Sequence, residues 1–206
     1  MRLLRNGGLM NIAVFASHGG SDMQAIVDGC KQNLIRARVA VVISNNKESM
    51  ALERARKEEL PHYHLSAKLL GSEEALAEKI LEVLEEYRID MIFLAGYMRM
   101  LHPSVLERYH NRVFNIHPAL LPKYGGRGMY GIHVHEAVIA AHEKETGVTI
   151  HRVNAEYDSG EIVAQTTVPV LAEDTAETLA ARVLEREHAF LVEVISDIAN
   201  GKIKLG

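Results

Sequence analysis

The feature of this sequence that most constrains its fold is a regular alternation of short apolar runs with longer amphipathic segments. The apolar runs contain many Val, Ile and Phe residues and lack a polar residue at every second position, which is typical of parallel strands covered on both faces. They are IAVFAS (12–17), RVAVVIS (38–44), MIFLAGY (91–97) and RVFNIH (112–117). The segments between them repeat apolar residues at three- and four-residue steps, which predicts helices. These helices are expected over residues 23–32, 48–58 and 73–87 and directly after Pro103.

This alternation predicts an α/β fold with an open, mostly parallel, doubly wound (Rossmann-like) sheet, because strand–helix–strand units return to one sheet by right-handed crossovers. The rhythm changes after residue 126. A helix over residues 133–145 precedes two β-rich runs joined by the turn AEYDSGE, which predicts a C-terminal β-hairpin. A long C-terminal helix follows, with Asp174 expected as its N-cap and Glu177 completing a capping box.

Length and composition favour one domain. The 206 residues are enough for one sizeable core, and no linker or repeat divides them. We expect residues 10–206 to form this single domain, beginning at Met10, and residues 1–9 to be a disordered leader without the apolar run of a signal peptide or membrane span. Whether Met1 or Met10 is the native start is left open.

Charge and cysteine content exclude several classes of partner. The formal net charge is -4, and neither sign is gathered into a block, so no nucleic acid and no membrane is expected as a partner. The single cysteine, Cys30, excludes an internal disulfide framework and fits a cytoplasmic protein.

The first candidate site is SHGGSD, residues 17–22, between the first predicted strand and the first predicted helix. Gly19, Gly20 and Ser21 form a candidate phosphate cradle, because free backbone N–H groups and the helix dipole favour an anion there. A tight turn with Ser21 or Asp22 as N-cap explains the same residues equally well. The carboxylate of Asp22 argues against an anion beside it.

The second candidate site is the end of the strand RVFNIH, where Asn115 and His117 lie. Ligands of open parallel sheets bind outside the carboxyl ends of the strands. Both side chains can donate hydrogen bonds to an oxyanion in acyl transfer, and one such donor contributes roughly 3 kcal/mol. Alternatively, they bond only to loop carbonyls.

Two further residues have an open interpretation. Asp158, in YDSG, is either a turn residue or a carboxylate that favours the protonated form of His117, if the fold brings the two together. Arg99 follows a predicted strand and either meets an anionic ligand or forms a salt bridge. His133 and His135 are two positions apart, which does not place them on one helical face, and no metal is expected.

The ordered set SHGGSDMQAI, SNNKESMALERA, LAGYMRML, FNIHPALLPKY, YDSGEIVAQ and EREHAF resembles the phosphoribosylglycinamide formyltransferases, which belong to the folate-dependent formyltransferase superfamily. The similarity extends from Met10 to the C-terminus. It implies transfer of a formyl group from the co-substrate 10-formyltetrahydrofolate to the amine of glycinamide ribonucleotide, in purine synthesis. The protein would act as a monomer or homodimer.

The resemblance implies roles for individual residues. Asn115 and protonated His117 would stabilise the tetrahedral oxyanion, and Asp158 would keep His117 protonated and organise proton transfer through water. Substrate phosphate and ribose would be bound by Gly19, Gly20, Ser21, Asp22 and Glu187. Folate would be bound by Arg99, Met100, Leu101, Asn154, Ala155, Glu156 and Tyr157. Further candidates are His133, His135, Thr149, His151 and Arg127.

The sequence departs from the family pattern in two places. Asp22 stands where many relatives have Asn, and residues 125–135 (GGRGMYGIHVH) form a longer, glycine-rich connection. This connection is either a flap with Arg127 reaching an anionic substrate or a solvated insertion. The alternative functions are formylation of another amine, such as aminoacyl-tRNA or a sugar nucleotide, formyltetrahydrofolate hydrolysis, and nucleotide binding without catalysis.

Overall fold

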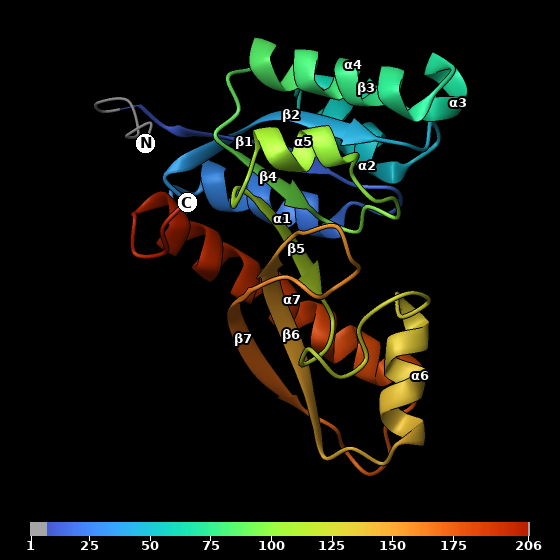
Figure 1. Cartoon of the computed structure of the whole chain (residues 1–206). Coiled ribbons are helices and arrows are strands. Elements are labelled where there is room, and N and C mark those ends of the chain that lie inside the picture. Colours follow the sequence, from blue (N-terminus) through green and yellow to red (C-terminus); the bar gives the residue numbers. More distant parts are fainter. Residues whose placement is uncertain (1–7, 206) are drawn as a thin grey trace.

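The structure is a computed structural model that describes residues 8–205. These residues build one seven-stranded sheet with the strand order β3-β2-β1-β4-β5-β6-β7 (Figure 1). The strands are β1 (Met10–Phe15), β2 (Ala37–Ser44), β3 (His62–His64), β4 (Met91–Leu94), β5 (Val113–His117), β6 (Glu145–Arg152) and β7 (Ile162–Pro169). The helices are α1 (Ser21–Lys31), α2 (Met50–Lys57), α3 (Ala67–Leu70), α4 (Glu73–Glu86), α5 (Pro103–Arg108), α6 (Ile132–Ala140) and α7 (Ala176–Ala199).

The predicted fold class is confirmed. Strands β1 to β5 pair in parallel, whereas β6 pairs antiparallel with both β5 and β7. The first strand begins at Met10, as expected, and residues 1–7 of the expected leader lie outside the described residues. None of the described helices is long and apolar enough to cross a membrane.

Apolar side chains cover both faces of the sheet. Along β1, Ile12 and Val14 belong to one buried cluster and Ala13 and Phe15 to another. The first cluster includes apolar residues of α1 and α7, and the second includes those of α4 and α5, so helices lie on both faces (Figure 1). The continuous apolar runs of the central strands follow from this double coverage.

The predicted helix pattern is wrong in two places. Helix α6 ends at Ala140 and not near residue 145, because His142 adopts a left-handed conformation (φ 53°) and Glu145 already pairs with Pro169 in the sheet. The sequence also does not predict the short helix α3.

The N-cap of α7 is Thr175 and not Asp174. The backbone N–H and side chain of Thr175 exchange hydrogen bonds with Thr178, so Glu177 takes no part in the capping box. Asp174 instead accepts two hydrogen bonds from Arg182, at 2.6 and 2.7 Å, which lower the pKa of its carboxyl far below the usual value. The carboxylate that the sequence predicts as the helix cap therefore forms a salt bridge instead.

The β6–β7 pairing predicts a strong effect of Gly147→Ala. A Cβ atom at this position would lie 2.1 Å from the carbonyl oxygen of Thr166, so the strands would have to separate. We expect the free energy of unfolding to fall by about 1–3 kcal/mol in a urea titration. Gly19→Ala, whose Cβ would meet nothing within 4 Å, is the control, and equal effects of both changes would contradict this packing.

Candidate active site

A cavity of about 770 Å³ opens at the carboxyl ends of β1, β4 and β5. This is the edge of an open parallel sheet where ligands bind. Its wall consists of residues 18–22, 94–101, 115–118 and 126–132, together with His135, His151, Val153, Asn154, Glu156, Tyr157, Asp158, Ala180, Leu184 and Glu187. Asn115, His117 and Asp158 therefore share one cavity with the glycine loop.

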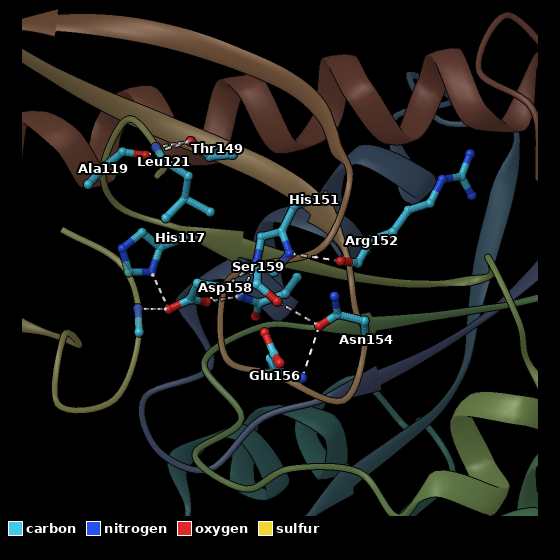
Figure 2. Close-up of polar contacts among 12 residues, drawn as sticks. His117, Ala119, Leu121, Thr149, His151, Arg152, Asn154, Glu156, Asp158 and Ser159 are labelled. Atoms are coloured by element: carbon cyan, nitrogen blue, oxygen red, sulfur yellow. Dashed lines mark hydrogen bonds and ion pairs between the residues drawn. The ribbon is translucent and has the colours of Figure 1, made fainter. Parts of the chain in front are cut away.

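The carboxylate of Asp158 is the centre of the polar contacts in this cavity (Figure 2). Its Oδ2 accepts a hydrogen bond from the Gly126 N–H at 2.9 Å and lies 3.6 Å from His117 Nδ1. Its Oδ1 lies 3.4 Å from His151 Nε2 and accepts a hydrogen bond from Asn115 Nδ2 at 3.5 Å. The fold thus brings Asp158 beside His117.

Burial and charge oppose each other at this centre. Burial raises the pKa of Asp158. Hydrogen bonds from His151 and Gly126, together with the charges of the nearby imidazoles, lower this pKa by a larger amount, so it lies below the usual value. Burial lowers the pKa of His117, and the smaller effect of Asp158 raises it. Without substrate, Asp158 favours the imidazolium as expected but does not keep the pKa of His117 above its ordinary value.

Both ring nitrogens of His117 are engaged. Nε2 donates a hydrogen bond to the carbonyl of Tyr124 at 2.7 Å, whereas Nδ1 faces Asp158. His151 donates from Nδ1 to the carbonyl of Arg152 at 2.9 Å, and its Nε2 lies 3.1 Å from Asn115 Nδ2 and 3.4 Å from Asp158 Oδ1. The imidazoles are therefore held at fixed orientations.

Two glycines of the 125–135 connection hold Asp158 in place. A Cβ on Gly125 would lie 2.5 Å from Leu121 Cδ2 and 3.2 Å from Asp158 Cβ. Gly126 has a φ of 93°, which favours glycine, and its N–H binds the carboxylate. The sequence shows the glycines but not this contact, which joins segments 32 residues apart.

Thr149 does not line the cavity, contrary to its place among the candidate site residues. It is buried, and its hydroxyl donates to the Ala119 carbonyl at 2.6 Å and accepts from the Leu121 N–H at 3.1 Å (Figure 2). It therefore positions the loop that follows β5. In the loop of residues 154–157, Ala155 also does not line the cavity. Asn154 Oδ1 organises that loop by accepting a hydrogen bond from the Glu156 N–H at 3.0 Å.

The glycine loop enters α1 without a side-chain cap. Gly20 is the N-cap, with a φ of 69°, and neither Ser21 nor Asp22 caps the helix, so that interpretation is wrong. A Cβ on Gly20 would lie 2.7 Å from Ala51 Cα. Asp22 Oδ1 instead lies 3.3 Å from Nε2 of His188, a residue that the sequence analysis does not single out.

Glu187 is a buried carboxyl in the cavity wall. No hydrogen bond or ion pair joins it to another residue of the described chain, and burial, with the charge of Asp22, raises its pKa well above the usual value. A protonated carboxyl at this position can both donate to and accept from a ligand hydroxyl.

The remaining candidates separate into wall residues and surface residues. Arg99 lines the cavity with Met100 and Leu101, and its guanidinium also pairs with Glu73 at 3.1 Å, the salt bridge that the sequence leaves open. Arg127, Glu156 and Tyr157 also lie in the wall. His135 lies in the wall too, is buried, and has no partner for its Nδ1 among the described residues. His133 is exposed outside the wall, where its Nδ1 lies 3.0 Å from Glu136. His133 and His135 thus point to different places, and residues 8–205 contain no group of three or more potential metal ligands.

Ser17 is a structural residue that the sequence analysis does not assign. It is 1% exposed, and its Oγ accepts from the Met98 N–H at 2.8 Å and donates to Asn45 Oδ1 at 2.5 Å. These bonds tie together the loops after β1, β2 and β4. Its position at the end of an apolar run is the signal that identifies it.

The balance at His117 predicts the outcome of an NMR titration. Its pKa should lie below 6.5 in the wild type, because burial outweighs Asp158. In Asp158→Asn it should fall further, because the charge that raises it is gone. Asp197→Asn, an exposed carboxylate paired with Lys202, is the control and should leave it unchanged. A rise in Asp158→Asn would contradict this description.

Comparison with known proteins identifies the family. The sequence profile described as formyl transferase matches residues 10–195. Phosphoribosylglycinamide formyltransferase of Escherichia coli (strain K12) is 39% identical over 196 residues, which cover 95% of this chain and 90% of that protein. The chloroplastic enzyme of the same name from Arabidopsis thaliana is 41% identical over 194 residues, covering 94% of this chain and 66% of that protein.

A solved structure agrees with these relatives. Glycinamide ribonucleotide transformylase 1 from Symbiobacterium toebii superimposes with a TM-score of 0.87 at 37% sequence identity, covering 98% of this chain and 92% of that chain. The profile match, the sequence relatives and this fold confirm the resemblance seen in the sequence, and the chain belongs to the formyl transferase family.

Proposed function

We propose that this protein transfers the formyl group of 10-formyltetrahydrofolate to the primary amine of glycinamide ribonucleotide, in purine biosynthesis. The relatives are named for this activity or its substrate. The observation that carries the proposal is that Asn115, His117 and Asp158 share one cavity with the glycine loop and Glu187. One cavity thus combines a candidate oxyanion site with a candidate site for a ribose phosphate.

The nucleotide substrate fits the side formed by α1 and α7. The first N–H groups of α1 lack partners within the helix, which favours a phosphate at Gly19, Gly20 and Ser21. Glu187 supplies a carboxyl for the ribose hydroxyls. The pterin belongs on the other side, against Met100, Leu101 and the loop of residues 154–157.

In the proposed reaction, the amine of the nucleotide attacks the formyl carbon, the new C–N bond forms, and the carbonyl oxygen becomes an oxyanion. Asn115 Nδ2 and His117 Nε2–H donate to this oxygen. The latter donor is bound to the Tyr124 carbonyl in the structure, so substrate must displace that carbonyl. The neutral ring already carries the required N–H, and the lowered pKa of His117 does not prevent this role.

The tetrahedral intermediate then collapses. The bond between the formyl carbon and N10 of the folate breaks, N10 takes up a proton, and the former amine loses one. Asp158 is the base that accepts this proton through water, since its pKa lies below the usual value and its carboxylate is ionised near neutral pH. Because Asp158 Oδ2 lies 3.6 Å from His117 Nδ1, the same carboxylate favours the protonated form of this donor.

Formylation of another amine and hydrolysis of the folate would use the same oxyanion site. We propose glycinamide ribonucleotide because Glu187 and the glycine loop form a phosphate and ribose site beside that centre. We expect the reaction to take place in the cytoplasm, in a monomer or homodimer without a required metal. A nucleotide-binding protein without catalysis would not need Asn115, His117 and Asp158 in one cluster.

An assay with purified protein tests the substrate. Glycinamide ribonucleotide and 10-formyltetrahydrofolate should give formylated product, followed by the absorbance of tetrahydrofolate, and omission of the amine should stop the reaction. Release of formate without the amine would identify a hydrolase. Faster turnover of a different amine would identify another formyltransferase.

The catalytic roles predict a specific kinetic pattern. His117→Ala and Asp158→Asn should each lower kcat by about 10²–10⁴-fold, because each removes a donor or a base, while KM changes by less than about fivefold. His110→Ala, an exposed histidine outside the cavity wall, is the control. A rise in KM with unchanged kcat would instead assign the two residues to binding.

A further inference from the structure

The carboxylate of Asp22 lies in the wall of the proposed phosphate cradle. Glu187 lines the same part of the cavity, and the charge of Asp22 raises the pKa of that second carboxyl. A phosphate entering the cradle would therefore meet an adjacent negative charge, which disfavours binding unless a cation compensates it. The following inference rests on the proposed function, because it concerns the phosphate of that substrate.

His188 is the residue in contact with Asp22 that can carry a positive charge. Its Nε2 lies 3.3 Å from Asp22 Oδ1, close enough for an ion pair although the two are not aligned as a hydrogen bond. Both atoms are buried, and neither has a hydrogen-bond partner among residues 8–205. Each of these two atoms is therefore the other's polar contact. Their interaction is a favourable ion pair if the imidazole is protonated.

His188 lines a second cavity, of about 440 Å³, between α1, α2 and α7. The side chain is 34% exposed, compared with 13% for Asp22. Ser21 lines both cavities, whereas Asp22 lines the first and His188 the second.

The other charged groups around His188 are already engaged or lie on its own helix. Arg54 of α2 lines the second cavity and donates from Nε to the Gly19 carbonyl at 3.0 Å. Asp28 of α1 accepts from Gln24 at 3.0 Å. Glu187, the preceding residue on α7, belongs to the substrate cavity. Within the described chain, an ion pair to Asp22 is formed by His188 alone.

We propose that His188, in its protonated form, neutralises Asp22 and thereby sets the affinity of the cradle for the phosphate of the substrate. His188 is a positioning residue, because it acts on the phosphate through Asp22. Removing one member of a buried pair leaves an uncompensated charge. Loss of His188 should therefore harm phosphate binding through Asp22, and loss of both members should not.

A double-mutant cycle tests this coupling, with wild type, His188→Gln, Asp22→Asn and the double variant. His188→Gln should raise KM for glycinamide ribonucleotide about tenfold or more, with kcat within about threefold. Asp22→Asn should lower that KM, and His188→Gln added to it should change KM by less than about twofold. His110→Gln, at an exposed histidine that lines neither cavity, controls for the substitution itself.

A second arm isolates the phosphate. Binding of glycinamide riboside, which lacks the phosphate, should be equal in wild type and His188→Gln by calorimetry. If His188→Gln raises KM equally in the wild-type and Asp22→Asn backgrounds, or weakens the riboside as much as the ribonucleotide, His188 has only a structural role and the inference is overturned.

Two further outcomes remain decisive. If His188→Gln is unfolded by circular dichroism, inorganic phosphate must inhibit Asp22→Asn at lower concentration than wild type, and inhibition at equal or higher concentration overturns the inference. If wild type does not formylate glycinamide ribonucleotide, the proposed function fails, and calorimetry with inorganic phosphate still tests the inference, which equal affinities of wild type and His188→Gln would overturn.

Discussion

The carboxylate of Asp158 is the interaction on which the candidate active site depends. It contacts the end of β5 through Asn115 and His117, β6 through His151, and the connection before α6 through Gly126. These segments are distant in the chain, and antiparallel pairing of β5 with β6 brings two of them side by side. A change that moves Asp158 would therefore alter both imidazoles and the loop together.

The surrounding structure sets the chemistry of this carboxylate. Burial disfavours charge on Asp158 and on His117, whereas hydrogen bonds and opposite charge favour it. For Asp158 the hydrogen bonds outweigh burial, and for His117 burial outweighs the carboxylate. The pKa values of both groups thus lie below their usual values. The resemblance implies a protonated His117, and Nε2 carries an N–H toward the Tyr124 carbonyl in either protonation state.

The fold class and the location of the site follow from local features of the sequence. Continuous apolar runs separated by amphipathic segments predict a parallel sheet, and polar residues at the end of such a run predict that Asn115 and His117 face a ligand. Contacts between distant segments have no such local signal. The bond of Gly126 to Asp158, the support of the 118–121 loop by Thr149, and the pairing of Asp22 with His188 all belong to this class. The prediction of Asp174 as the N-cap of α7 is wrong for a related reason, because Arg182, farther along the same helix, binds the Asp174 carboxylate.

The most direct test of this account is a crystal structure with glycinamide ribonucleotide and a stable analogue of the formyl folate. We predict that Asn115 Nδ2 and His117 Nε2 both lie within about 3.2 Å of the oxygen that represents the formyl group. His117 should have left the Tyr124 carbonyl while Asp158 keeps its contact with Nδ1. If His117 stays on the Tyr124 carbonyl and the formyl oxygen contacts neither side chain, the proposed oxyanion site is wrong.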